Sequence, residues 1–221
     1  MPQFPSSFPI FPLPNVVLFP GMDLPLHIFE PRYRLMTAHA LESDQVIGMV
    51  LIRPGETPMQ PRAPIFEIGC AGRMTRVQQL PDGRYGFVLV GERRFRVERE
   101  PETEQPYRTA EAEFLSDPDF ASLPSGQRDG LQRAAEHLSL SVIEFARQAA
   151  PRSLETLRAR MRDLDPVALS HFLAFALDCA PVEKQTLLET DDPGLRLETL
   201  VRIVEIRRAE IAHPGGSDSV N

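Results

Sequence analysis

Residues 11–21 read FPLPNVVLFPG, and residues 24–34 read LPLHIFEPRYR. The first stretch breaks short apolar runs at Pro12, Pro14 and Pro20, and a proline cannot donate a backbone hydrogen bond to a neighbouring strand. The pattern therefore predicts strands that are bent or that lie at the edge of a sheet. Pro31 stands where a helix would begin, a position that its fixed φ favours. We expect these strands to lead directly into one helix near residues 31–41.

The rest of the first half continues this β pattern. Residues 46–52 (VIGMVLI) are a continuous apolar run, which is typical of a strand covered on both faces. Residues 80–84 (LPDGR) predict a turn, because proline presets one dihedral angle and glycine accepts a positive φ. The flanking segments predict a hairpin over residues 74–90, and residues 110–114 alternate apolar and polar side chains. About six or seven short strands indicate a closed or nearly closed barrel.

The second half changes to a helical period. Leu131, Ala135, Leu138 and Val142 recur at the spacing of one helix face, and similar stripes follow up to residue 211. Short loops between these segments imply antiparallel packing in a bundle. We therefore expect an α+β protein with a β domain over residues 1–118, a helical bundle over 119–212 and a flexible tail over 213–221.

The opening stretches resemble the N-terminal, substrate-binding domain family of Lon proteases. Residues 68–72 (IGCAG), 80–84 and 91–96 (GERRFR) extend the resemblance, which covers residues 8–115 in motif detail. The family implies a PUA-like β pseudo-barrel followed by a helical bundle, and a role in recognising protein substrates. Small bacterial proteins of this layout are similar to Lon in this one domain, so we expect a stand-alone Lon-domain protein.

The motifs of a complete Lon protease are missing from the sequence. There is no GxxxxGK[ST] phosphate loop and no Gly-x-Ser-x-Gly turn. Lys184 is the single lysine, and Ser141 and Ser170 lie within helical patterns, where a serine–lysine dyad has no support. The five histidines and two cysteines show no metal-ligand spacing. We expect no enzymatic activity, no cofactor and no metal.

A first candidate site lies where the predicted strand meets the helix, at His27, Glu30, Arg32 and Tyr33. A carboxylate is favoured near the backbone amides that begin a helix, and an arginine close by can pair with it. These four residues therefore serve either to fix the strand–helix junction or to contact a ligand.

A second candidate site is the basic group Arg73, Arg76, Arg94 and Arg96. It suggests an alternative function, the binding of RNA or another polyanion, which the PUA relationship also implies. The net charge of −7 argues against a nucleic-acid partner. The other interpretation of these arginines is a solvated face paired with nearby glutamates.

The resemblance implies partners that are unfolded polypeptides or exposed apolar segments, with a separate protease or chaperone as a further partner. No apolar run reaches the roughly 20 residues that a membrane span needs. The low cysteine content fits a reducing cytoplasm. We expect a cytoplasmic, non-catalytic peptide-binding module, with its groove beside an open sheet edge or where the two domains meet.

Overall fold

The structure, a computed structural model, describes residues 4–56 and 62–212, which divide into two compact units. The β unit comprises residues Met1–Ser116 together with Phe175–Glu189, and the helical unit comprises Asp117–Ala174 together with Thr190–Asn221. The division expected from the sequence placed residues 175–189 in the bundle. The contacts group this segment with the strands instead.

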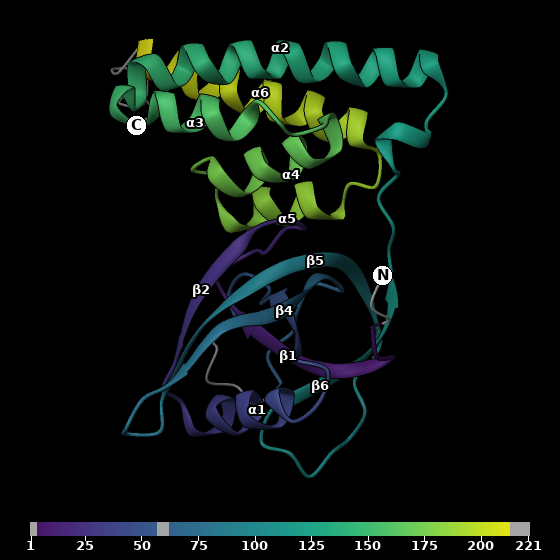
Figure 1. Cartoon of the computed structure of the whole chain (residues 1–221), viewed down its shortest axis with the longest axis vertical. Helices are drawn as coiled ribbons and strands as arrows, with labels where there is room; N and C mark the ends of the chain where they lie inside the picture. Colours follow the sequence, from purple (N-terminus) through teal and green to yellow (C-terminus); the bar gives the residue numbers. More distant parts are fainter. Residues whose placement is uncertain (1–3, 57–61, 213–221) are drawn as a thin grey trace, which may run out of the picture. The chain divides into compact units, whose positions relative to one another are not determined.

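The β unit is built on six strands. They are β1 (Ser7–Leu13), β2 (Asp23–Ile28), β3 (Val46–Leu51), β4 (Ile68–Gln79), β5 (Tyr85–Arg99) and β6 (Arg108–Phe114). Their order is β2-β5-β4-β3-β1-β6, and β5 also pairs with β6. The pairings of β5, β4, β3, β1 and β6 therefore form a closed circuit (Figure 1). Within the described residues β2 pairs only with the first part of β5, so β2 is an edge strand.

Of the two alternatives expected for the proline-containing strands, bent or at an edge, the edge position does not apply to β1. It pairs with β3 on one side and with β6 on the other. The backbone amide of Ile52 donates to the carbonyl of Leu13. The backbone N–H and C=O groups of the odd-numbered residues of β1 therefore point toward β3, and the backbone nitrogen of Pro12 points away from β3. The pairing with β6 ends at Ile10. The nitrogen of Pro12 thus faces a side where no strand needs its hydrogen bond.

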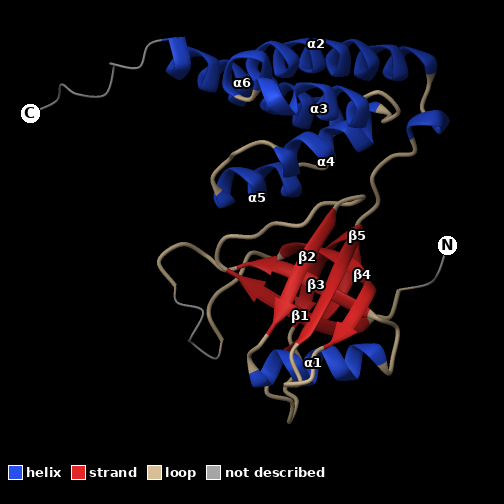
Figure 2. Ribbon diagram, turned by 60° about the vertical axis from the view of Figure 1, so that its left-hand side comes forward, coloured by secondary structure: helices blue, strands red, loops and turns tan. Residues whose placement is uncertain are grey.

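The core of the β unit depends on close packing around two glycines. Phe8 and Phe95 are buried and meet edge to face, with their ring centroids 5.1 Å apart. A Cβ on Gly69 would collide with the carbonyl oxygen of Met49 and lie 2.7 Å from the Phe95 ring, and Gly48 is equally confined. The helix α1 (Pro31–Leu41) begins at Pro31 as predicted and lies across one end of the strands (Figure 2).

Helix α5 (Pro181–Glu189) also belongs to the β unit, although it is distant in sequence. The side-chain amide of Gln185 donates to the carbonyl of Ile68 at 2.9 Å. The guanidinium of Arg94 donates to the carbonyl of Leu188 at 3.0 Å. Two buried polar side chains therefore attach this helix to β4 and β5.

Within residues 117–174 and 190–212, the helical unit contains α2 (Ser125–Ala149), α3 (Leu154–Met161), most of α4 (Pro166–Ala176) and α6 (Pro193–Ala212). It also contains two short turns, η1 (Phe120–Ser122) and η2 (Pro151–Ser153). Helices α2 and α6 lie side by side and run parallel, because Gly194 lies near Leu131 while Arg208 pairs with Glu144 at 3.0 Å. The antiparallel expectation concerned helices joined by short loops, and α2 and α6 are separated in the chain by α3, α4 and α5. Among the described residues, no helix combines the length and the apolar character needed to cross a membrane.

Candidate functional site

Strands β2, β5 and β4 present one side of the sheet away from the core. Residues directly opposite each other in paired strands point to the same face. The register places Pro25 and Thr75 on either side of Val88, and Asp23 and Arg73 on either side of Val90. The alternate residues Met74, Phe87 and Leu89 are buried on the opposite face. The cross-strand rows Pro25–Val88–Thr75 and Asp23–Val90–Arg73 therefore lie on the side of these three strands that points away from the core. We call this side the outer face.

The outer face is apolar at its centre and open above it. Pro25 is exposed, and Val88 and Val90 are half-buried. A Cβ built on Gly86, next to Val88 on the same face, would meet no atom within 4 Å. The open space there means that no described part of the chain covers this end of the face.

Ion pairs surround these apolar side chains. Arg76 reaches Asp23 at 2.7 Å, which links β4 to β2 across β5, and Arg73 reaches Glu92 at 3.1 Å. Arg76 lies at a β-bulge and has a φ of +52°, a conformation that costs a non-glycine residue energy. Exposed pairs of this kind add little stability. Their charges are matched, so the outer face has no strong excess of either sign at these positions.

Three of the four residues predicted at the strand–helix junction form one packed group. Glu30 and Arg32 form an ion pair at 3.0 Å, and the Arg32 guanidinium lies 4.5 Å from the centre of the Tyr33 ring. Tyr33 is buried and packs against Phe11, with ring centroids 4.4 Å apart. Burial is the main cause that raises the pKa of Tyr33 above its usual value. This geometry favours the structural interpretation of Glu30, Arg32 and Tyr33.

His27 lies apart from that group, on the outer face. It is exposed, sits opposite Gly86, and its Nε2 atom is 3.2 Å from Nη1 of Arg84. The Phe29 ring stacks beside it at 6.5 Å and is 62% exposed. Phe29 is not among the residues predicted to form a site. Counting by twos from Pro25 through His27 would have placed it on this face.

The predicted polyanion face does not form as one surface. Arg94 is 1% exposed and is bound to α5, so the expectation that it faces solvent is corrected. The guanidinium groups of Arg73 and Arg76 are paired as described above, and Arg96 pairs with Glu113 at 3.2 Å. The remaining three arginines therefore each have an acidic neighbour.

A second concave surface lies in the helical unit, and we call it the helical groove. It has a volume of 460 Å³ and is lined by residues of α2, α3 and α4 and of the segment between α3 and α4. Leu140 stands at its opening with 68% of its surface exposed, and Met161 and Leu169 are buried beneath. Arg158 and Arg162 also line it.

The groups considered for catalysis make helix contacts. The Lys184 amine donates to the carbonyl of Phe175 at 2.7 Å, and burial lowers its pKa. The Ser170 hydroxyl donates to the carbonyl of Val167 at 2.7 Å, and Ser141 is buried on α2. Across residues 4–56 and 62–212, no group of three or more metal-ligating side chains occurs.

Comparison with known proteins gives one consistent match. Residues 7–205 match the family of the ATP-dependent protease La (LON) substrate-binding domain. The chain is 27% identical over 209 residues to a Lon protease of Cytophaga hutchinsonii, which covers 92% of this chain and 24% of that protein. It is 29% identical to a Lon protease of Roseiflexus castenholzii, over 94% of this chain and 25% of that protein. The chain thus spans about a quarter of the length of these relatives.

Solved structures show the same fold. The crystal structure of a Lon N-terminal domain protein from Xanthomonas campestris is 25% identical and has a TM-score of 0.62, over 89% of this chain and 97% of that one. The N-terminal domain of a Mycobacterium avium complex Lon protease is 16% identical and has a TM-score of 0.68, over 90% and 98%. These matches cover both the strands and the helices.

Proposed function

The chain belongs to the LON substrate-binding domain family, and from this premise we propose that it binds exposed apolar segments of other polypeptides without hydrolysing them. The observation that carries the proposal is the outer face of β2, β5 and β4, where exposed Pro25 and half-buried Val88 and Val90 lie between ion pairs. The substrates of a protease are polypeptides, and an unfolded polypeptide differs from a folded one mainly in the apolar side chains that it exposes.

Contact with the outer face would come mainly from Pro25, Val88, Val90 and Phe29. Burying apolar surface contributes roughly 25 cal/mol per Å² before the cost of ordering the bound segment is subtracted. A shallow face of this size supports binding on the order of micromolar for one segment. Such weak binding suits a surface that accepts many sequences.

The edge of β2 adds a limited number of backbone partners. The carbonyl of Met22 accepts a hydrogen bond from the amide of Gly91. The backbone N–H and C=O groups of the even-numbered residues of β2 therefore point toward β5, and those of the odd-numbered residues point toward the free edge of the sheet. An extended peptide could pair with the backbone of Asp23 and His27. Pro25 lies between them and has no N–H to donate. We therefore propose the outer face, and not continuous strand addition, as the main source of affinity.

The test compares one model protein in two forms, a carboxymethylated form that cannot fold and its disulfide-bonded folded form. The wild-type chain should bind the unfolded form only. Replacing Phe29→Ser and Val88→Thr together should weaken that binding about tenfold, because roughly 1.4 kcal/mol of apolar contact is removed. Arg99→Gln, an exposed substitution in the far part of β5, is the matched control. Equal binding to both forms, or binding to neither, would contradict the proposal.

The non-catalytic part of the proposal has its own assay. The purified chain is expected to leave casein unhydrolysed, because Ser170 and Lys184 are held in helix contacts. It is expected to leave ATP unhydrolysed, because the sequence has no GxxxxGK[ST] phosphate loop. Hydrolysis that disappears on Lys184→Ala substitution would show that a catalytic site is present.

A further inference from the structure

We infer that the helical groove is a second binding site, and that it takes an apolar polypeptide segment flanked by acidic side chains. The inference rests on the proposed function, since its ligand is also a polypeptide. The helical groove differs from the outer face in its location and in its preference for acidic residues beside the apolar segment.

The floor and opening of the helical groove are apolar. Leu140 and Ile143 of α2 face the groove with buried Ala135, Met161 and Leu169 beneath or beside them. A single exposed leucine is common on protein surfaces, but this one stands over a hollow that is itself apolar. The volume of 460 Å³ lies within the usual range for ligand sites and has room for a few side chains.

Basic side chains surround this hollow. Residues 144–163 contain five arginines and three acidic residues, in a chain whose net charge is −7. Arg158 and Arg162 line the groove itself, and Arg158 is paired with Glu155 at 3.1 Å. The acidic residue Glu136 also lines the groove and accepts a hydrogen bond from Gln132 at 3.0 Å. The groove lining therefore carries two arginines against one glutamate, in a chain whose net charge is negative.

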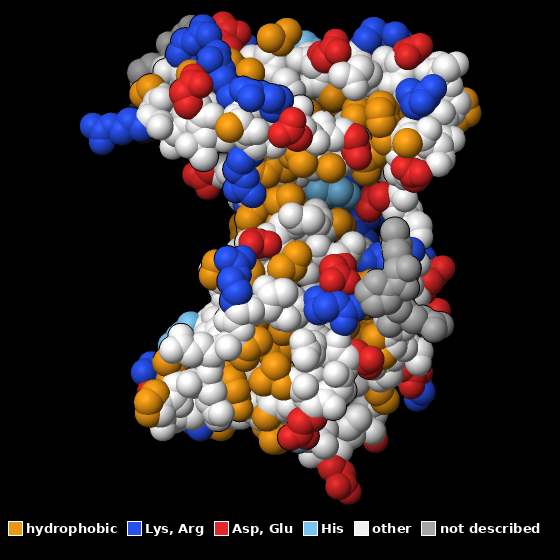
Figure 3. All heavy atoms as spheres, in the orientation of Figure 1, with side chains coloured by type: hydrophobic (Ala, Val, Ile, Leu, Met, Phe, Trp, Pro, Cys, Tyr) orange, Lys and Arg blue, Asp and Glu red, His pale blue; other side chains and the backbone are white. Residues whose placement is uncertain are grey.

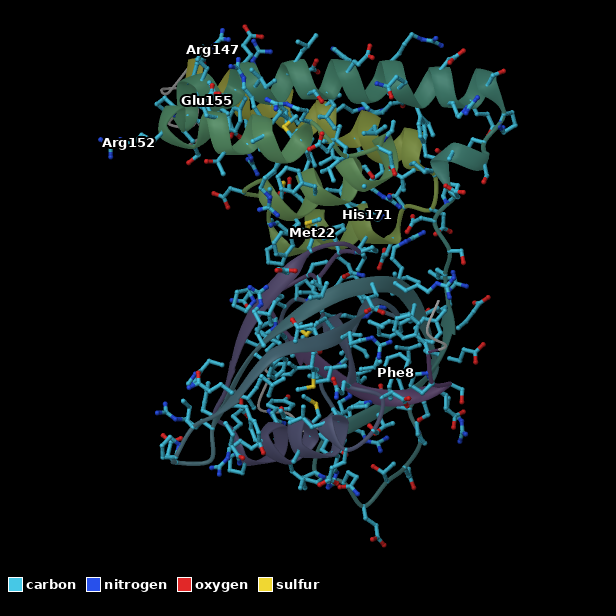
Figure 4. All side chains as sticks on the ribbon, viewed as in Figure 1. Phe8, Met22, Arg147, Arg152, Glu155 and His171 are labelled. Atoms are coloured by element: carbon cyan, nitrogen blue, oxygen red, sulfur yellow. The ribbon has the colours of Figure 1, made fainter. Side chains whose placement is uncertain are left out.

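More arginines gather at the end of the helical unit where α2 stops and α3 begins. Figure 3 shows Lys and Arg side chains clustered there, and Figure 4 places Arg147 and Arg152 at this end, with Arg152 pointing away from the helices. The side chains of Arg147, Arg152 and Arg162 make no hydrogen bond or ion pair with any residue that the structure describes. Unlike the paired arginines of the outer face, they are available to a carboxylate.

Charge and shape together favour a polypeptide ligand over RNA. The residues that line the groove include no aromatic ring on which a base could stack, and stacking supplies much of the affinity for single-stranded RNA. An aliphatic or aromatic side chain fits the apolar floor, and aspartates or glutamates beside it reach the arginines.

The experiment uses two short labelled peptides with the same Leu-Leu-Phe centre, one flanked by aspartates and the other by asparagines. Binding to the full chain is measured by fluorescence anisotropy. The aspartate peptide should bind more tightly, by roughly threefold for each arginine engaged, as expected for exposed ion pairs. This preference should disappear in an Arg158→Gln, Arg162→Gln double variant. Leu140→Ser should weaken binding of the aspartate peptide while leaving thermal stability unchanged, since Leu140 is exposed.

The outcomes separate this inference from the proposed function. If both peptides bind equally, and binding responds to the Phe29→Ser, Val88→Thr variant but not to the groove variants, the groove inference is wrong while the proposed function stands. If neither peptide binds, both fail. Displacement of the aspartate peptide by oligo-uridylate at lower concentration than by unlabelled peptide would overturn the choice of ligand. A dimer that dissociates on Leu140→Ser substitution would overturn it in favour of a second copy of the chain.

Discussion

Nη2 of Arg196 lies 3.0 Å from Oδ1 of Asp117, and the arginine side chain is completely buried. Nη1 of the same guanidinium donates to the Ser170 hydroxyl at 3.0 Å, and the second carboxylate oxygen of Asp117 lies 3.2 Å from Nε2 of His171. This one ion pair therefore joins the segment before α2, the middle of α4 and the start of α6. It holds together three parts of the helical unit that are far apart in sequence.

Removing the negative charge from this network should destabilise the chain strongly. Asp117→Asn preserves the shape of the side chain but removes the negative charge that the buried Arg196 guanidinium contacts, and this should lower the free energy of unfolding by about 3 kcal/mol. Urea denaturation followed by circular dichroism measures the change. Glu113→Gln, in the exposed pair with Arg96, is the control and should change stability by less than about 1 kcal/mol. Comparable losses for the two variants would show that burial does not set the cost.

Two glycines of the β unit offer a matched pair of substitutions. Gly69→Ala places a methyl group against the Met49 carbonyl and the Phe95 ring, and this overpacking should cost about 2 kcal/mol or more. Gly86→Ala meets open space on the outer face and should leave stability within about 0.5 kcal/mol of wild type. Thermal unfolding of the two variants compares them directly. A loss at Gly86 equal to that at Gly69 would mean that the outer face is covered after all.

Much of the fold follows from local sequence patterns. The helix starting at Pro31, the turn at residues 80–84 and the change to helical periodicity are local signals, and the structure contains each of them. The parallel arrangement of α2 and α6 was not predictable in this way, because it depends on the elements that intervene. The assignment of residues 175–189 to the β unit depends on contacts of Arg94 and Gln185 with distant backbone groups.

The candidate site was harder to predict, because register decides which residues share a face. The arginines at positions 73, 76, 94 and 96 look alike in the sequence, yet Arg94 points inward and is covered by α5. Phe29 is apolar, yet it is exposed and continues the outward side of β2. The helical groove combines three helices and the segment between two of them, and no single stretch of sequence indicates it.

The buried phenol of Tyr33 should make stability fall at alkaline pH. Burial raises its pKa in the folded chain above the value of about 10 in the unfolded chain. Above that pH the unfolded state binds fewer protons than the folded state, so the free energy of unfolding decreases as pH rises toward the folded pKa. Tyr33→Phe keeps the contact with Phe11 and should make this decrease smaller. Urea denaturation at a series of pH values from neutral to alkaline measures the free energy of unfolding against pH. If the decrease with pH is as steep in the variant as in the wild type, it is caused by other groups.

At the exposed edge of β2, Pro25 directs its backbone nitrogen outward. Exposed strand edges tend to pair with a second chain, and a proline at an outward position prevents one of the hydrogen bonds that such pairing needs. Pro25→Val supplies that N–H and favours the extended conformation, so it should increase self-association relative to wild type. Sedimentation velocity over a range of protein concentrations measures the change. Pro81→Val, in the exposed turn between β4 and β5, also replaces a proline but adds no donor to the β2 edge, and it should sediment like wild type. If Pro25→Val also sediments like wild type, then this proline does not protect the edge, and a bound peptide could use the backbone of β2 more fully than we propose.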